Sequence, residues 1–156
     1  TYPLPEAQLD RFTFKLWLDY PEEEDEVEIM TRQLSGQRIE VEKISSAEEI
    51  VELQRLTDTV YLDDIILEYI RDIIFKTRND PQIKMGAGPR ASLTLMKTAK
   101  ARAAILGRNY VTPDDVKQLC IPVLNHRLML NPEAELEGLT TSAVINRILE
   151  DVRVPM

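Results

Sequence analysis

The chain has 156 residues, of which 44% are hydrophobic and 29% are charged. This composition fits a globular domain with a sizeable core and excludes a disordered chain. The net charge is −8 at pH 7, which argues against a general nucleic-acid-binding surface, because such surfaces are basic. We therefore expect no nucleic-acid partner. No run of about 20 apolar residues predicts a membrane span.

The single cysteine and the single histidine exclude several kinds of site. Cys120 cannot form an intrachain disulfide, which suits a reducing compartment, and we expect a cytoplasmic location. Cys120 also falls at an apolar position of a predicted helix, so we interpret it as a core thiol rather than a nucleophile. His126 has no second imidazole to pair with, and no metal site is expected.

The first twenty residues predict a short helix followed by one strand. Pro5 suits the first turn of a helix over residues 6–11. From Phe12 to Leu18 the side chains alternate with a period of two, which is typical of a strand. A single strand cannot satisfy its own backbone groups. Its partners should therefore lie upstream, in another chain, or in a short extended piece near Ile39 and Val41.

The remaining sequence predicts a succession of helices. We expect helices over about 22–34, 46–60, 62–79 and 90–106, another that starts at Thr112–Pro113, and a last one from Thr140 or Thr141 to before Pro155. The helices from Ser46 onward should form a self-sufficient bundle. The side chains expected to face its core are Ile50, Leu53, Leu56, Val60, Ile66, Ile70, Ile73, Ile74, Leu93, Met96, Ala99, Ala103, Val116, Leu119, Cys120, Val123, Leu124, Val144, Ile145, Ile148 and Leu149.

Two arginines, Arg11 and Arg90, are candidates for a functional role. Residues 86–90 (GAGPR) place Arg90 at the start of a long helix. Helix N-termini attract phosphate, and a guanidinium matches phosphate oxygens. A basic residue in the first turn also opposes the helix dipole, which indicates another reason for its presence. From the residues alone, an ordinary first-turn arginine and an anion ligand stay about equally open. Arg11, between Asp10 and Phe12, fits a surface arginine or a local salt bridge better than a functional role.

Several kinds of catalytic motif are missing from the sequence. No G-x-x-x-x-G-K-[ST] loop occurs. No Ser–His–Asp, Cys–His or paired-carboxylate pattern has supporting spacing. Asp63 and Asp64 follow three apolar residues, which weakly resembles the Mg²⁺-binding strand of nucleotide hydrolases. A predicted helix begins at once, so we interpret the two aspartates as its start.

Motifs along nearly the whole chain resemble MoxR-type AAA+ ATPases. Residues 4–12 (LPEAQLDRF) are similar to the stretch that follows sensor 1 in this family. Residues 20–25 (YPEEED) resemble the start of the lid, and residues 86–92 (GAGPRAS) resemble the sensor 2 motif. Residues 109–116 (NYVTPDDV) and 125–128 (NHRL) resemble the lid helices that follow. The motifs occur in the order that the family shows.

The resemblance implies a mainly α fold in two parts. Residues 1–20 would be a C-terminal remnant of the α/β ATPase core, with the arginine-finger helix and the last strand. Residues 21–156 would form an all-helical lid domain with sensor 2. The P-loop, the Mg²⁺-binding strand and sensor 1 would lie upstream of Thr1. We therefore expect a fragment that is inactive alone and binds no nucleotide, with Arg90 facing solvent or a crystal anion.

The resemblance also implies a function for the intact protein. Members of the family form rings of identical subunits, here expected to be a hexamer, with ATP and Mg²⁺ between subunits. ATP turnover would drive remodelling, assembly or metal loading of client proteins, and the client is not identified. Arg11 matches the arginine finger that acts on the neighbouring subunit, and Arg90 matches sensor 2, in cis or in trans. Glu6 and Gln8 belong to the finger motif and would support it.

Two alternatives remain beside this reading. The first is a magnesium-chelatase or helicase-type ATPase of the same clade. Residues 4–8 (LPEAQ) favour the MoxR type, and the acidic balance disfavours a ring that tracks along DNA. The second is a helical protein-interaction module without a nucleotide role, in which charge reversal at Arg11 and Arg90 would leave the full-length ATPase unaffected.

Overall fold

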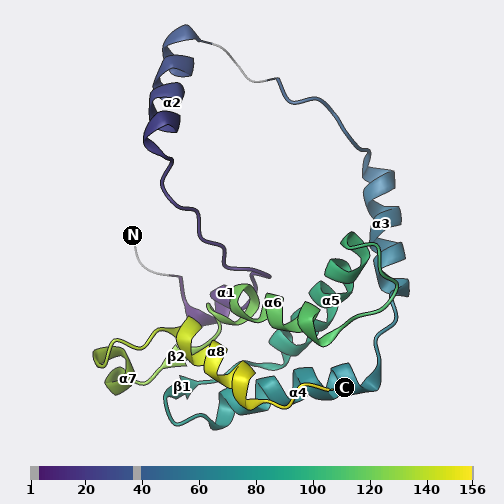
Figure 1. Cartoon of the computed structure of the whole chain (residues 1–156), viewed down its shortest axis with the longest axis vertical. Coiled ribbons are helices and arrows are strands. Elements are labelled where there is room, and N and C mark those ends of the chain that lie inside the picture. The colour runs from purple at the N-terminus through teal and green to yellow at the C-terminus, as the bar shows by residue number, and fades with distance from the viewer. Residues whose placement is uncertain (1–3, 37–39, 156) are drawn as a thin grey trace.

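Four helices form the body of the molecule (Figure 1). The computed structural model describes residues 4–36 and 40–155. The four helices are α4 (Asp64–Asn79), α5 (Pro89–Ile105), α6 (Pro113–Leu124) and α8 (Thr141–Asp151). Each of them contacts at least two of the others. Their buried side chains, which include Ile73, Leu95, Val116 and Ile148, make one continuous core. The mainly α fold expected from the sequence is confirmed.

The starts of these helices follow from capping residues in the sequence. Asp63 Oδ1 accepts a hydrogen bond from the backbone N–H of Ile65 at 3.1 Å, at the beginning of α4. Thr140 Oγ1 accepts one from Ala143 N–H at 3.2 Å, at the beginning of α8. Such caps satisfy N–H groups that have no partner inside the helix. Asp63 is therefore a helix cap, as interpreted above.

A small two-stranded sheet was not predicted. β1 (Ile83–Met85) pairs antiparallel with β2 (Met129–Leu130), and the helix α7 (Pro132–Leu136) follows β2. Elements of two to five residues are too short to produce a hydrophobic period. The sheet joins the loop before α5 to the loop after α6, so it holds together the two segments that carry the site described below.

The strand predicted from Phe12 to Leu18 is not present in the structure. Residues 12–22 are not assigned to a strand or helix, and Leu18 is 97% exposed. One hydrogen bond between backbone groups links this segment to the body, from Lys15 N–H to the carbonyl oxygen of Pro122 at 2.9 Å. A strand needs a neighbouring strand for its ladder, and none lies beside it in the described ranges. Val41 is in no strand either, and Ile39 lies outside the described residues.

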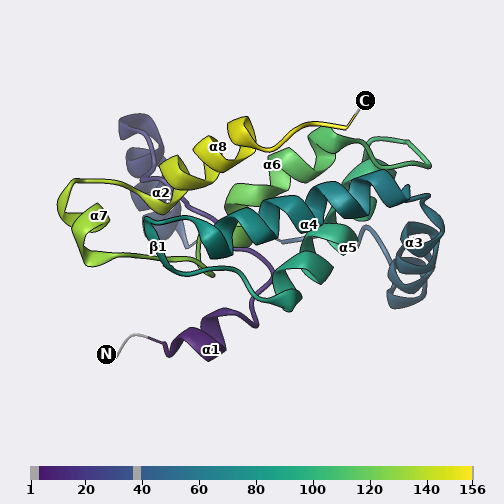
Figure 2. The same cartoon turned by 90° about the horizontal axis from the view of Figure 1, so that it is seen from below.

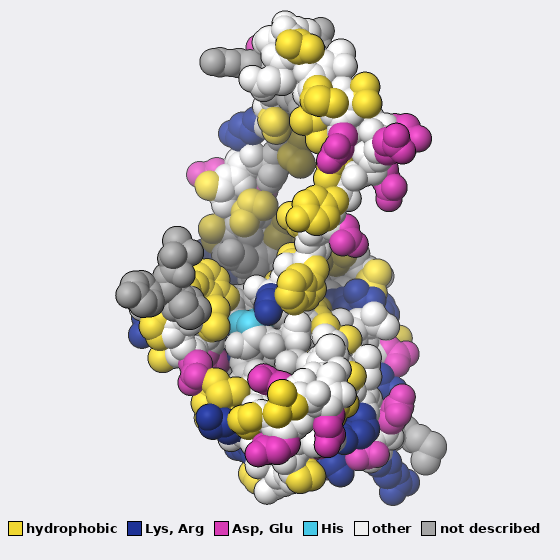
Figure 3. All heavy atoms as spheres, turned by 90° about the vertical axis from the view of Figure 1, so that its left-hand side faces the viewer, with side chains coloured by type: hydrophobic (Ala, Val, Ile, Leu, Met, Phe, Trp, Pro, Cys, Tyr) yellow, Lys and Arg dark blue, Asp and Glu magenta, His cyan; other side chains and the backbone are white. Residues whose placement is uncertain are grey.

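Two helices lie outside the buried core, and the second of them contacts α5 (Figure 1). They are α2 (Glu23–Ser35) and α3 (Ala47–Thr59), and neither contains a buried residue. Figure 3 shows apolar side chains along the arm that leads to α2. α3 begins at the predicted capping box of Ser46 and Glu49. Its stripe at Ile50, Leu53 and Leu56 is exposed, so the bundle begins at Val60 rather than at Ser46.

Two predictions about the core had different outcomes. Leu93 was expected to face inward, but it is exposed, and Leu95 is buried in its place. Leu95 continues the four-residue spacing of Ala91, Ala99 and Ala103, all of which are fully buried. Cys120 is fully buried as expected, and burial raises the pKa of its thiol to about 12. A thiol with such a pKa is an inert core group.

The shortest helix lies at one side of the body. α1 (Glu6–Leu9) is shorter than the helix predicted over residues 6–11. Figure 2 shows α1 on the side of the body opposite the C-terminus.

No helix in the described ranges, 4–36 and 40–155, is long and apolar enough to cross a membrane.

Candidate functional site

The turn before α5 is fastened to the end of α4. The backbone N–H of Ala87 donates to Thr77 Oγ1 at 3.1 Å, and Arg78 Nε donates to the carbonyl oxygen of Ala87 at 2.8 Å. Gly86 allows this close approach. A Cβ atom at Gly86 would lie 2.7 Å from both Arg78 Cα and the Thr77 carbonyl oxygen. The backbone that leads to Arg90 is therefore held in one place.

Arg90 lies in the first turn of α5, as the sequence predicted, and its side chain is 51% exposed. It does not simply face solvent. Arg90 Nη1 donates to Asp10 Oδ2 at 3.1 Å. The start of α5 is thus linked to the residue that directly precedes Arg11.

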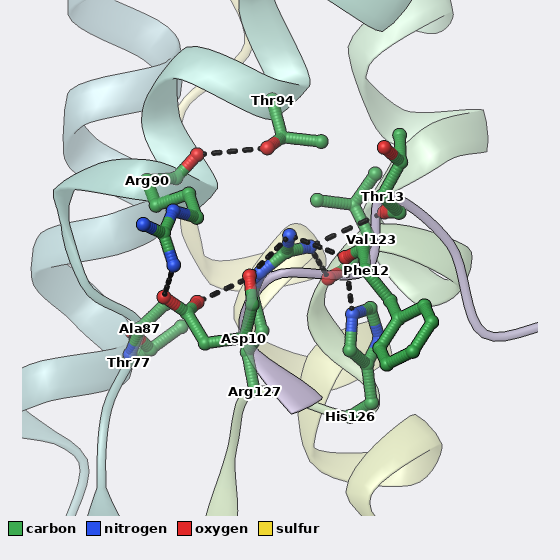
Figure 4. Close-up of polar contacts among 10 residues, drawn as sticks. All are labelled: Asp10, Phe12, Thr13, Thr77, Ala87, Arg90, Thr94, Val123, His126 and Arg127. Atoms are coloured by element: carbon green, nitrogen blue, oxygen red, sulfur yellow. Dashed lines mark hydrogen bonds and ion pairs between the residues drawn. The ribbon is translucent and has the colours of Figure 1, made fainter. Parts of the chain in front are cut away.

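Asp10 bridges two arginines (Figure 4). Its Oδ2 accepts from Arg90, and its Oδ1 accepts from Arg127 Nε at 3.0 Å. The carboxylate lies between the two guanidinium groups, one half-exposed and one buried. A partly exposed pair such as Asp10–Arg90 contributes about 1 kcal/mol or less, so an anion with more charge can displace Asp10 from Arg90.

Arg127 is the residue that the sequence did not single out for a role. Its side chain is only 1% exposed, and all three guanidinium nitrogens donate hydrogen bonds. A buried charge is tolerated only when it is paired and hydrogen-bonded. One signal was available in the sequence: the apolar spacing of Cys120, Val123 and Leu124 continues to position 127, where an arginine stands.

His126 supports the same segment. Its Nε2 lies 2.9 Å from the carbonyl oxygen of Phe12. Burial lowers the pKa of His126 below its ordinary value of 6.5, more than the contact with Phe12 raises it. The neutral ring therefore predominates at neutral pH, with its Nε2–H donated to Phe12. In the part of the chain that the structure describes, no group of three or more His, Cys, Asp or Glu is arranged to hold a metal.

Arg11 is exposed, and the structure gives its side chain no hydrogen bond or ion pair with another described residue. Its backbone is fixed, because Arg11 N–H donates to the Gln8 carbonyl oxygen at 3.1 Å. Gln8 and Glu6 are both exposed on α1. The structure thus places Arg11 at the end of α1, with Asp10 joining that end to Arg90.

A pocket of about 470 Å³ lies between α1 and the β1–β2 sheet. Glu6 and Asp10 line it from α1, Gly86 and Gly88 line it from the turn before α5, and Arg127 lines it from the turn after α6. The site can supply fixed positive charge to an anion. No nucleophile paired with a base is present among the side chains described for it.

Comparisons with known proteins define the class. The AAA lid domain family matches residues 75–148, which run from the end of α4 into α8. A crystal structure of a candidate ATPase from Cytophaga hutchinsonii superposes with a TM-score of 0.89 at 37% identity. The superposition covers 99% of this chain and 50% of that one. The helical body is therefore an AAA lid domain.

Two curated relatives match the whole chain. An uncharacterized protein, YeaC of Bacillus subtilis, is 45% identical over 100% of this chain and 49% of its own length. Chaperone MoxR1 of Mycobacterium tuberculosis is 36% identical over 99% of this chain and 43% of its own length. The chain belongs to the MoxR-type AAA+ ATPases. It spans about half the length of the curated relatives it matches. Shorter matches reach magnesium-chelatase subunits at 30–35% identity.

Proposed function

We propose that this chain is the lid-bearing C-terminal part of a ring-forming ATPase, and that Arg11 and Arg90 act together on the nucleotide of the neighbouring subunit. Residues 1–20 belong to the ATPase core in this proposal, and residues 21–156 form the lid. The observation that carries it is the contact of Arg90 with Asp10, the residue next to Arg11.

Arg90 is bonded to Asp10, the neighbour of Arg11, so the two arginines share a surface. Consecutive Cα atoms are about 3.8 Å apart, so a side chain bonded to Asp10 is held close to Arg11. Both arginine side chains are exposed. Because a finger serves the nucleotide of the adjacent subunit, an Arg90 held beside the finger faces the same nucleotide. The shared surface therefore favours Arg90 acting in trans over Arg90 acting in cis.

Each arginine has a separate task in this proposal. Arg11 stabilises the charge that develops on the transferred phosphoryl group, which for such fingers is worth about 10³–10⁵ in rate. Arg90 exchanges Asp10 for a phosphate oxygen when nucleotide binds, because a phosphate carries more charge and matches the guanidinium fork. Glu6 and Gln8 support α1, and Gln8 accepts the backbone hydrogen bond of Arg11. In the described residues no group of three or more His, Cys, Asp or Glu is arranged to hold a metal, and we assign no Mg²⁺ ligand to this chain.

The intact protein is proposed to be a cytoplasmic hexameric ring that uses ATP and Mg²⁺ to remodel, assemble or load metal into client proteins. The chaperone name of the Mycobacterium tuberculosis relative supports this role. The magnesium-chelatase matches keep a chelatase-type ATPase as the second candidate. The chain alone should not hydrolyse ATP, since the sequence contains no P-loop.

The finger assignment is tested in the complete ATPase. Arg11→Ala should abolish ATP hydrolysis and leave ATP binding within about two-fold, because the finger acts in the transition state. Arg71→Ala is the matched control, since Arg71 is an exposed arginine paired only with its neighbour Asp72 in the structure as described. Wild-type turnover by the Arg11→Ala enzyme would refute the proposed function and favour the interaction module.

A further inference from the structure

We infer that Arg127 is the positioning residue for Arg11: from the turn after α6, its guanidinium holds the backbone on both sides of the finger. The inference rests on the proposed function, since it assigns the finger role to Arg11. Figure 4 shows the Arg127 guanidinium beside the segment that runs through Asp10, Phe12 and Thr13.

Arg127 donates hydrogen bonds to backbone carbonyl oxygens on both sides of Arg11 in the chain. Nη2 donates to the carbonyl oxygen of Asp10 at 3.1 Å and to that of Phe12 at 2.7 Å. Nη1 donates to the carbonyl oxygen of Thr13 at 3.3 Å and to that of Val123. The residue before Arg11 and the two residues after it are therefore all held by one side chain.

Only an arginine can make this set of contacts. Its planar guanidinium presents five N–H donors in a fixed fork, whereas a lysine ammonium presents three donors at one point. The carbonyl oxygens of Asp10, Phe12 and Thr13 lie at different places along the chain, and the Asp10 carboxylate is a fourth acceptor. A lysine at position 127 would leave several of these oxygens without a donor.

Two further contacts hold the same segment to the same end of α6. His126 Nε2 bonds the Phe12 carbonyl oxygen, and Lys15 N–H donates to the Pro122 carbonyl oxygen. Residues 122–127 thus hold residues 10–15 at several points. A displacement of the lid body must carry the backbone of Arg11 with it. The position of the finger then depends on the position of its own lid.

The hydrogen bonds from Arg127 to residues 10–13 are tested on the 156-residue chain by limited trypsin digestion. Trypsin cleaves after Arg11 only when the local backbone opens. Arg127→Met should speed cleavage after Arg11 by about ten-fold or more. Arg147→Met is the control, because Arg147 also bonds two polar side chains, Asp80 and Gln82, at 2.6 Å, and has no hydrogen bond to residues 10–15 among the described residues. Equal cleavage after Arg11 in the two variants would overturn the inference.

The effect on catalysis is tested in the complete ATPase. Arg127→Met and Arg127→Lys should each lower kcat by about 100-fold, since a misplacement of about 1 Å at a catalytic group costs this much. With kcat expressed per folded enzyme, KM for ATP should stay within about two-fold, because the finger acts in the transition state. Arg147→Met should keep kcat. A wild-type kcat in the Arg127 variants would overturn the inference.

A double variant tests whether Arg127 affects turnover through Arg11. The comparison uses an Arg11→Lys background whose turnover is first measured above the blank. In that background Arg127→Met should lower kcat by no more than about two-fold, because residues that act as a unit are not additive. A full 100-fold loss in that background would contradict action through Arg11. Failure of the proposed function is a different result: the Arg11→Ala enzyme would then turn over ATP like the wild type.

Discussion

Asp10 Oδ2 lies 3.1 Å from Arg90 Nη1, although the two residues are 80 positions apart in the chain. The contact joins the end of α1 to the start of α5. The second oxygen of the same carboxylate accepts from Arg127, which is buried. Asp10 therefore stands between a half-exposed arginine that can exchange partners and a buried one that cannot.

Asp10→Asn should destabilise the chain, because the neutral amide leaves the buried Arg127 without its charged partner. We expect the free energy of unfolding to fall by about 1–3 kcal/mol. The measurement is urea denaturation of both proteins at pH 7.5. Asp72→Asn serves as control, since Asp72 pairs with Arg71 on the exposed surface. An Asp10→Asn chain no less stable than the Asp72→Asn chain would show that the pair with Arg127 contributes nothing.

Gly86 and Gly88 flank the turn before α5 and offer a matched pair of substitutions. Gly86→Ala should cost about 1–3 kcal/mol, because the new Cβ meets backbone atoms at 2.7 Å. Gly88→Ala should cost less than about 1 kcal/mol, because nothing lies within 4 Å of its Cβ and its φ is −80°. Thermal unfolding of the two variants makes the comparison. Equal losses would mean that the turn is not pressed against α4.

The neutral form of His126 should make the stability of the chain depend on pH. The pKa of His126 is lowered in the folded state, so the unfolded chain binds the proton more readily. The contribution is fully present above pH 6.5, the ordinary histidine value, and is lost as the pH falls through the folded pKa.

The measurement is the free energy of unfolding between pH 7.5 and pH 5.5, in the wild type and in His126→Gln. Glutamine keeps an N–H donor for the Phe12 carbonyl oxygen but does not titrate in this range. The wild type should lose more stability on acidification than the variant. Parallel curves would show that His126 does not titrate below its ordinary value.

The helices of the body could be predicted from the sequence because their signals are local. The caps at Asp63, Thr112 and Thr140 and the isoleucine stripe of α4 specify where helices begin and which face is buried. The position of Arg90 in the first turn of α5 followed from Gly88 and Pro89 in the same way.

The sequence does not show which element packs against a helix face or pairs with an extended segment. The period of two over residues 12–18 describes an extended backbone, but a ladder depends on another strand. The stripe of α3 has helical spacing, yet the structure leaves it exposed. Arg127 was missed for the same reason, since its partners Asp10 and Phe12 are more than a hundred residues away.

Mixed rings of the complete ATPase distinguish an Arg90 that acts in trans from one that acts in cis. Arg11→Ala subunits and Arg90→Ala subunits are first shown to be inactive separately and are then assembled together. If Arg11 and Arg90 both serve the nucleotide of the neighbouring subunit, each interface receives both arginines from one subunit. Every interface in a mixed ring then lacks one of them.

The most direct test of this account is therefore ATP turnover by rings assembled from equal amounts of the Arg11→Ala and Arg90→Ala subunits. The account predicts that turnover stays at the level of the separate variants. If Arg90 instead served the nucleotide of its own subunit, about a quarter of the interfaces in a randomly mixed ring would be intact. Recovery of turnover to about a quarter of the wild-type rate would contradict the account.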